Sequence, residues 1–279
     1  MTPAACRAVV LAVALAGLPV FGQGQSAKQP PQKQPAPKQK AGDIPNFSTA
    51  AFDPTVESLP ARFPGHSCRA IAKALKASNP AKGEFETSDA YSKRLEGIKT
   101  TALFGGVAAN DIFSFVRPVL SQDIKYEADS QTMYVYYLLP INLASRRSAA
   151  DLVDVSLPKR TTYTGENAYG KKVSVEKAVY DVCALSLKNI EYEPRRTSAN
   201  DGFKISPEEA RLTKENLALL YVGKLAEPYY VQYGNISKPT IDAPTDVLWN
   251  GDSVVIEVLS VWAIDKSTGR VLKKDFRVR

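Results

Sequence analysis

The sequence predicts an α+β fold: an antiparallel, β-rich domain, sandwich-like or built on one large twisted sheet, with two or three helices and a C-terminal β-hairpin. Three observations lead to this prediction. The end of the chain, Ser253–Arg279, reads as a hairpin, period-two apolar runs recur between residues 112 and 187, and helix signals are few and stand apart from those runs. Strands that follow one another without an intervening helix are typical of antiparallel hairpins rather than βαβ units.

The first arm of that hairpin is apolar on both faces. Strict alternation places Val254, Ile256, Val258, Trp262 and Ile264 on one face, and Val255, Leu259, Val261 and Ala263 on the other. Two apolar faces are typical of a central strand that is covered on both sides. A turn over residues 265–269 follows, and the more polar return arm is typical of a sheet edge.

The start of the chain predicts export. Residues 1–24 combine a single arginine, an apolar run over Ala8–Phe21 and small residues, which predicts a secretory signal peptide that is cut after Gly22, Gly24 or Ala27. The run is shorter than the ~20 residues that cross a bilayer, so we expect no transmembrane segment after cleavage. No cysteine directly follows the run, and we therefore expect no lipid anchor.

The rest of the chain divides by composition. Residues 25–42 are rich in Pro, Gln and Lys, which predicts a disordered linker. Residues 43–279 form a folded α+β domain, either single or divided into two subdomains near residue 200. Five of the 36 basic residues precede that domain, so it carries 31 basic against 29 acidic residues. Because this balance is nearly neutral and no basic stripe with interleaved aromatics is present, we expect no nucleic-acid partner.

Three segments carry helix signals. The first, over 67–78, places Cys68, Ile71, Ala72 and Leu75 on one face. The second begins at residue 87 or 88 and directs Tyr91, Leu95 and Ile98 inward. The third begins at Ser206, with Pro at the first helical position and Glu at the third, and is short.

The second helix begins within the segment KGEFETSDAYSKRL, Lys82–Leu95. Its K-x-E-F-E-T-x-x-x-Y-x-x-R pattern resembles a segment that recurs in uncharacterised bacterial envelope and secreted proteins. Two other stretches are similar to the same group: YTGENAYGKKVSV at residues 163–175, and KPTIDAPTDV at residues 238–247 with the hairpin that follows. The resemblance implies an envelope location and no activity.

Alternating apolar residues predict strands over residues 112–119, 124–128, 132–139, 151–157, 160–164 and 173–187. The second and third of these strands are expected to pair around Asp129-Ser130. Residues 217–225 either continue the third helix or form a strand, and their alternation favours the strand. Residues 228–247 are expected to form one strand and a long loop that leads into the final hairpin.

The residues that commonly carry chemistry are scarce. His66 is the only histidine, which excludes multi-histidine zinc sites, and the common nucleotide-binding and hydrolase motifs are absent. We predict no metal and no cofactor. A Cys-His nucleophile formed by Cys68 and His66 is one interpretation. The simpler one is a disulfide between Cys68 and Cys183, the two cysteines that remain after the signal is removed.

Paired carboxylates are present but not distinctive. The pairs are Glu84 with Glu86, Glu208 with Glu209, and Asp242 with Asp246. Such pairs are found as helix caps and solvated surface in many soluble domains, so they identify no glycoside hydrolase site.

Tyrosines are the more suggestive feature. Tyr134, Tyr136, Tyr137, Tyr163, Tyr169, Tyr229, Tyr230 and Tyr233 recur near expected strand faces and loops. Tyrosine suits glycan or peptide recognition, although it also fills sheet edges. Tyr163, Asn167 and Tyr169, in and beside the loop of residues 165–170, are the predicted binding residues, because Gly, Asn and Tyr combine tight turning with adaptable hydrogen bonding.

These observations favour a non-enzymatic module, periplasmic or secreted, that binds an envelope protein or glycan. The alternative is a hydrolase that acts on envelope polymer through paired carboxylates.

Overall fold

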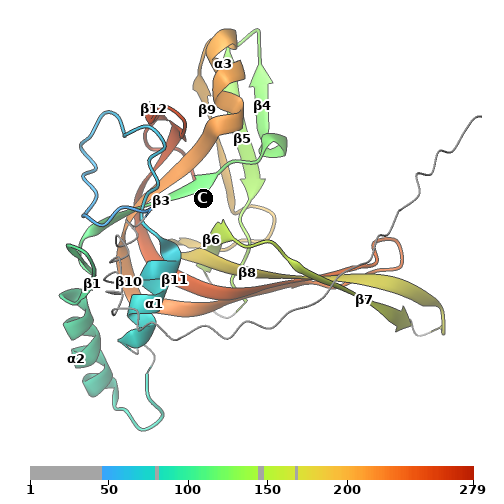
Figure 1. Cartoon of the computed structure of the whole chain (residues 1–279), viewed down its shortest axis with the longest axis horizontal. Helices are drawn as coiled ribbons and strands as arrows, with labels where there is room; N and C mark the ends of the chain where they lie inside the picture. Colours follow the sequence, from blue (N-terminus) through green and yellow to red (C-terminus); the bar gives the residue numbers. More distant parts are fainter. Residues whose placement is uncertain (1–45, 79–81, 144–147, 167–168) are drawn as a thin grey trace, which may run out of the picture. The chain divides into compact units, whose positions relative to one another are not determined.

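The computed structural model describes residues 46–78, 82–143, 148–166 and 169–279, and Ile44–Arg279 form one compact unit. The predicted signal peptide (1–24) and linker (25–42) lie outside the described residues. In the described part of the chain, two larger sheets and three α-helices confirm the predicted α+β class (Figure 1). No helix within those ranges is both long enough and apolar enough to span a bilayer.

The larger sheet has seven strands. Its order is β3 (Ile112–Pro118), β10 (Leu217–Ser237), β11 (Thr245–Asp265), β8 (Lys172–Glu191) and β6 (Ser148–Val155), with β12 (Arg270–Lys273) beside β11 and β7 (Lys159–Glu166) beside β8. The predicted C-terminal hairpin is confirmed as β11 and β12, although β11 begins earlier than expected. Residues 217–225 are a strand, and the same strand, β10, continues to Ser237.

One strand pair departs from the predicted antiparallel pattern. Strands β8 and β11 run parallel, from Thr245 opposite Glu176 to Ile256 opposite Leu187. Each belongs to its own antiparallel hairpin, β7–β8 and β10–β11, and these two hairpins lie side by side in the same direction. Alternation of apolar residues in the sequence indicates the strands of each hairpin, but it does not indicate which strand of one hairpin pairs with which strand of the other.

The prediction of strict alternation along β11 is also wrong. Gly223 pairs with Val258 while its neighbour Val222 pairs with Ser260, so Leu259 is an extra residue in the ladder. Because of this bulge, every residue of β11 after Leu259 points to the face opposite to the one that strict alternation predicts. As a result Val261 and Ala263 join Val254 and Ile256 in the main core, while Trp262 and Ile264 pack in a second cluster on the opposite face.

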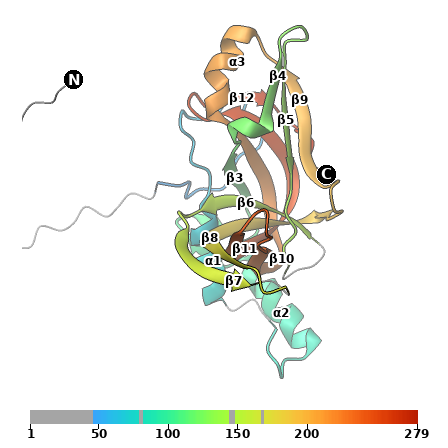
Figure 2. The same ribbon diagram turned by 90° about the vertical axis from the view of Figure 1, so that its right-hand side faces the viewer.

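The smaller sheet has three strands in the order β4 (Ile124–Glu127), β5 (Thr132–Leu138) and β9 (Ser198–Lys204). The predicted β4–β5 hairpin is confirmed. On β5, Met133, Val135 and Tyr137 are buried, whereas Tyr134, Tyr136 and Leu138 are exposed. Figure 2 shows this sheet together with α3 (Pro207–Thr213), the predicted short helix, which is capped by Ser206.

Helices α1 (Cys68–Ala77) and α2 (Ser88–Lys99) begin where the sequence predicts, with Ser67 and Thr87 as N-caps. The Cys68–Cys183 disulfide is confirmed, with Cα atoms 6.0 Å apart. It joins the first residue of α1 to the middle of β8. Because both cysteines are buried in the main core, the bridge fixes α1 against the larger sheet.

Beyond the core, β7 and residues 172–179 of β8 extend beside residues 230–237 of β10 and 245–251 of β11. This four-stranded extension, which we call the arm, lies on the right of Figure 1. The remaining short elements are β1 (Ala102–Phe104), β2 (Val107–Ala108) and two 3-10 turns, η1 (Ser121–Asp123) and η2 (Lys214–Asn216).

Candidate functional site

The predicted binding residues belong to the arm. Tyr163 lies on β7, and its hydroxyl donates to Oδ2 of Asp246 at 3.5 Å. Tyr169 is 94% exposed, and Asn167 lies outside the described residues. A cavity of about 270 Å³ in the arm is lined mainly by Gly165, Val173, Val175, Pro239 and Ile241. Its lining offers apolar surface but few polar groups to orient a ligand.

The Cys-His interpretation is wrong, because Cys68 is half of the disulfide and offers no thiolate. His66 is buried, and its ring accepts the Ser114 backbone N–H at Nδ1 (3.0 Å). Nε2 therefore carries the proton and donates to the Ala50 carbonyl at 2.9 Å. Burial lowers the pKa of His66, so the neutral ring is favoured. His66 joins the segment before α1 to β3.

Two of the three carboxylate pairs take part in local structure. Glu86 accepts two hydrogen bonds from Arg94, at 2.7 and 2.9 Å, and one from the Gly83 N–H. The Arg94 bonds are the main cause that lowers the pKa of Glu86 to about 2. Glu209 pairs with Arg270 and the helix cap Ser206, which lowers its pKa as well. A glycosidase needs one carboxylic acid with a raised pKa, and neither glutamate has one.

The structure also forms a buried polar cluster that the sequence did not indicate. The Asp151 carboxylate on β6 accepts the hydroxyls of Tyr137 and Tyr221, each at 2.7 Å. It also accepts Nε of Arg117 at 3.3 Å, and the Arg117 guanidinium lies 3.8 Å from the centre of the Tyr137 ring. Four residues from four strands thus meet. We call Arg117, Tyr137, Asp151 and Tyr221 the buried cluster.

Burial determines what the buried cluster can do. Asp151 is 2% exposed and Tyr221 is fully buried, so no ligand can approach the carboxylate directly. Burial raises the pKa values of Tyr137 and Tyr221 well above the usual value, which keeps both phenols protonated as donors. Because Tyr137 belongs to the smaller sheet and its partners to the larger one, the cluster joins the two sheets.

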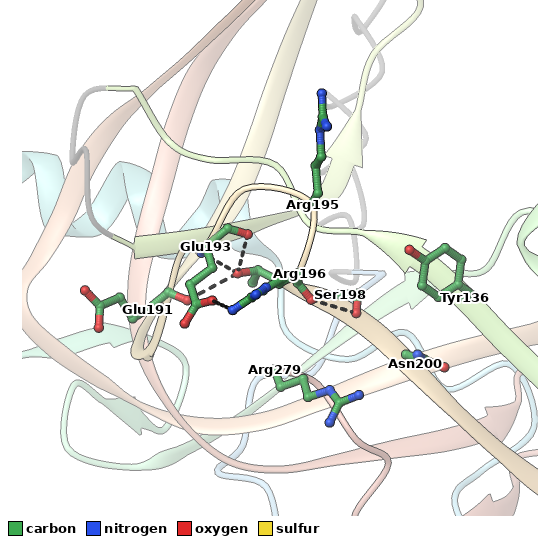
Figure 3. A pocket seen from close by; sticks show the side chains of 9 residues that line it. Tyr136, Glu191, Glu193, Arg195, Arg196, Ser198, Asn200 and Arg279 are labelled. Atoms are coloured by element: carbon green, nitrogen blue, oxygen red, sulfur yellow. Dashed lines mark hydrogen bonds and ion pairs between the residues drawn. The ribbon is translucent and has the colours of Figure 1, made fainter.

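An open pocket lies on the other face of the smaller sheet (Figure 3). It encloses about 480 Å³ and is lined by Tyr136, Glu191, Glu193, Arg195, Arg196, Thr197, Ser198, Asn200 and Arg279. Three parts of the chain form it: strand β5, the turn that leads into the start of β9, and the end of the chain beside β9. We call it the arginine pocket.

The turn on one side of the arginine pocket is held by Thr197. Its hydroxyl accepts the Glu193 N–H at 2.6 Å and lies within 3.3 Å of the carbonyl oxygens of Glu191 and Glu193. Arg195 at the tip has φ of 64°, a left-handed conformation that is uncommon outside glycine. Strained residues of this kind gather at functional sites, which marks the turn as a candidate.

The charged side chains of the pocket are only partly paired with one another. Nη1 of Arg196 lies 3.3 Å from Glu193. Among the described residues, the guanidinium groups of Arg195 and Arg279 meet no carboxylate. Figure 3 shows Arg195 directed away from the Glu193–Arg196 pair, and Arg279 directed toward the side of Asn200. The pocket therefore holds two arginines that are available to an anion.

Beside the pocket, Tyr134, Tyr136 and Leu138 form an exposed row along β5, which we call the tyrosine stripe. Their exposed fractions are 38%, 52% and 48%. Tyr136 lies opposite Asn200, and the Tyr134 ring lies over Gly202, where a Cβ atom would come within 2.7 Å of Cδ1. The absence of a side chain at residue 202 lets that ring lie close to the backbone.

The sequence drew attention to these tyrosines, but it did not separate their roles. The period-two alternation of residues 132–139 already places Tyr137 on one face of the strand and Tyr134 and Tyr136 on the other. Alternation does not indicate that β5 pairs with β9. It therefore does not indicate that Arg195 and Arg279 line the same pocket as Tyr136.

In the described residues no group of three or more histidine, cysteine or acidic side chains is placed to hold a metal ion. Comparison with protein-family models, with curated proteins and with solved structures found no match to this chain.

Proposed function

We propose that this protein is a non-enzymatic envelope module, periplasmic or secreted, that binds a glycan on the tyrosine stripe and in the arginine pocket. One observation carries the proposal: the half-exposed ring of Tyr136 borders a cavity of about 480 Å³ that also contains the Asn200 amide and arginine side chains. An aromatic ring packs on the apolar face of a sugar, while amide and guanidinium groups bond its hydroxyls.

A glycan fits this surface better than a protein partner does. The volume lies in the range of about 300 to 1,000 Å³ that is usual for small-ligand sites, and the lining offers several polar groups that converge. A protein interface of ordinary size has a broad core depleted in charge. The arginine pocket is instead small and rich in charged residues.

Three points support the envelope location. Disulfides such as Cys68–Cys183 persist in oxidising compartments, including the periplasm and the cell exterior. The resemblance of Lys82–Leu95 to envelope and secreted proteins agrees with that compartment, as does the expected signal over residues 1–24.

The test is calorimetric binding of the purified full chain to envelope glycan fragments. Tyr136→Ala removes the ring at the pocket and is expected to abolish most of the binding. Tyr169→Ala, which removes an equally large exposed ring from the arm, is the matched control and should bind like the unchanged protein.

Other outcomes would contradict the proposal in distinct ways. Loss of binding in Tyr169→Ala alone would move the site to the arm. Release of shortened products would favour the hydrolase. Capture of an envelope protein that survives Tyr136→Ala, with no glycan bound, would favour a protein partner.

A further inference from the structure

We propose that the arginine pocket selects glycans that carry carboxylate groups, such as uronic acids or carboxyethyl sugars, through Arg195 and Arg279. This inference rests on the proposed glycan-binding function and names the chemistry of the sugar unit. It follows from the charges of the pocket rather than from its aromatic ring.

The first step is the position of Arg279. Its backbone pairs with Ser198, with the Ser198 N–H donating to the Arg279 carbonyl at 2.5 Å and the Arg279 N–H donating back at 3.0 Å. Ala199 and Val278 form the adjacent antiparallel bridge. Arg279 is therefore aligned with Ser198 and Leu138 across the smaller sheet, on the face that displays the tyrosine stripe.

The second step is the position of Arg195. The Thr197 hydroxyl and the N–H groups of Arg196 and Thr197, which both donate to the Glu193 carbonyl, fix the turn around it. The turn holds Arg195 in the left-handed region although glycine would adopt that conformation more readily. A glycine there would relieve the backbone but would remove the guanidinium group.

The third step is the charge balance. Glu193 compensates Arg196 at 3.3 Å, and in Figure 3 the Glu191 carboxylate points away from Arg279. Within the described ranges, no carboxylate pairs with Arg195 or Arg279. Each of these two guanidinium groups lines the sugar-sized cavity and can accept an anion there.

A carboxylate fits this site best. The planar guanidinium presents two parallel N–H groups that match the two oxygens of a carboxylate. Tyr136 and both arginines line the same cavity, so a ring that bears a carboxylate can stack on tyrosine while its acid group meets Arg279. A free inorganic anion would use the arginines but not Tyr136.

The experiment measures calorimetric affinity of the full chain for uronic-acid and carboxyethyl-sugar oligosaccharides, each beside its carboxyl-reduced, neutral form. The unchanged protein is expected to bind the acidic form about 10- to 100-fold more tightly, the range of one or two hydrogen bonds to a charged group. The double variant Arg195→Gln/Arg279→Gln should bind the two forms equally.

The matched control is Arg160→Gln/Arg211→Gln, which removes the same charge from exposed positions on β7 and α3. It should keep the preference for the acidic form, which excludes a general effect of net charge.

Equal affinity of the unchanged protein for both forms, with both lost in Tyr136→Ala, would overturn the carboxylate inference and leave glycan binding intact. Failure of every acidic oligosaccharide to bind would also overturn it, and the envelope-fragment test would then decide the glycan proposal separately. Binding of inorganic phosphate that survives Tyr136→Ala, without binding of any carboxylated sugar, would assign the arginines to a phosphate instead.

Discussion

Tyr136 and Tyr137 are neighbours on β5, yet they face opposite environments. Tyr136 is half-exposed at the arginine pocket, whereas Tyr137 is buried and donates to Asp151. Arg117 contacts the Tyr137 ring, and Tyr136 lines the same pocket as Arg279. Arg117 is committed to Asp151 and to the Tyr137 ring, while Arg279 has no carboxylate partner among the described residues. The contrast teaches that polar groups with buried protein partners indicate structure, whereas exposed arginines without a carboxylate partner at an open cavity mark a candidate site for a ligand.

The largest expected effect comes from Asp151→Ala. The change leaves the Arg117 charge and two tyrosine hydroxyls buried without their acceptor, which is expected to lower the free energy of unfolding by about 3 to 5 kcal/mol. Urea denaturation measures it. Asp154→Ala is the control, because Asp154 is half-exposed and its ion pair with Arg69 contributes about 1 kcal/mol or less. Equal losses in the free energy of unfolding of the two variants would contradict the inference that the buried cluster stabilises the fold more than a surface ion pair does.

The second prediction compares the two tyrosines directly. Tyr137→Phe removes a hydroxyl that donates to a buried carboxylate, so we expect a loss of about 1.5 to 3 kcal/mol in the free energy of unfolding. Tyr136→Phe should change it by no more than about 0.5 kcal/mol, as is usual for surface substitutions. Matching urea midpoints for the two variants would contradict the division of roles between the faces.

The third prediction uses alkaline pH. Burial raises the pKa values of Tyr137 and Tyr221, so both keep their protons in the folded protein above the pH at which unfolded tyrosine ionises, about 10. The two tyrosines therefore contribute fully to the free energy of unfolding below about pH 10. As the pH rises further, the unfolded chain loses these protons first, and the free energy of unfolding falls by up to ~1.4 kcal/mol per pH unit for each tyrosine. Urea titrations above about pH 10 should show that the free energy of unfolding falls less steeply with pH in Tyr137→Phe than in the unchanged protein. The same slope against pH in both proteins would contradict the prediction.

A small stability effect and a change in affinity are expected on the open face. Gly202→Ala places a Cβ atom 2.7 Å from Cδ1 of Tyr134 and must displace that ring. We expect a loss of less than ~1 kcal/mol in the free energy of unfolding, because the ring is partly exposed and can move. Glycan affinity should fall a few-fold, since the tyrosine stripe is disturbed. Gly97→Ala, where a Cβ meets nothing within 4 Å, should leave affinity unchanged.

Local patterns predicted much of the fold. The helix cap at Ser206, the β4–β5 hairpin and the Cys68–Cys183 pair each depend on residues whose chemistry is specific at that position. Alternation failed at Leu259, because an extra residue in a ladder leaves no mark in the apolar pattern when both faces are apolar. The parallel contact of β8 and β11 depends on the meeting of two hairpins, which no local pattern encodes.

The candidate site was less predictable than the fold. The Gly, Asn and Tyr content of one loop led toward Tyr163 and Tyr169, while the wider set of tyrosines also included Tyr229 and Tyr233, which are buried. The distinguishing features of the arginine pocket are the approach of Arg279 to Ser198 and the left-handed Arg195. The approach of Arg279 depends on a contact between segments that are distant in the sequence, whereas the conformation of Arg195 depends on the hydrogen bonds of its own turn, which apolar alternation does not indicate.

The disulfide also determines how the chain behaves when its backbone is cut. Cys68 and Cys183 are 115 residues apart, and the segment between them includes the tip of the β7–β8 hairpin. Trypsin acting at Lys171 or Lys172 on that tip would divide the chain into two fragments, each with one half of the bridge. The nicked protein would therefore migrate as one covalent species until a reductant separates its two parts.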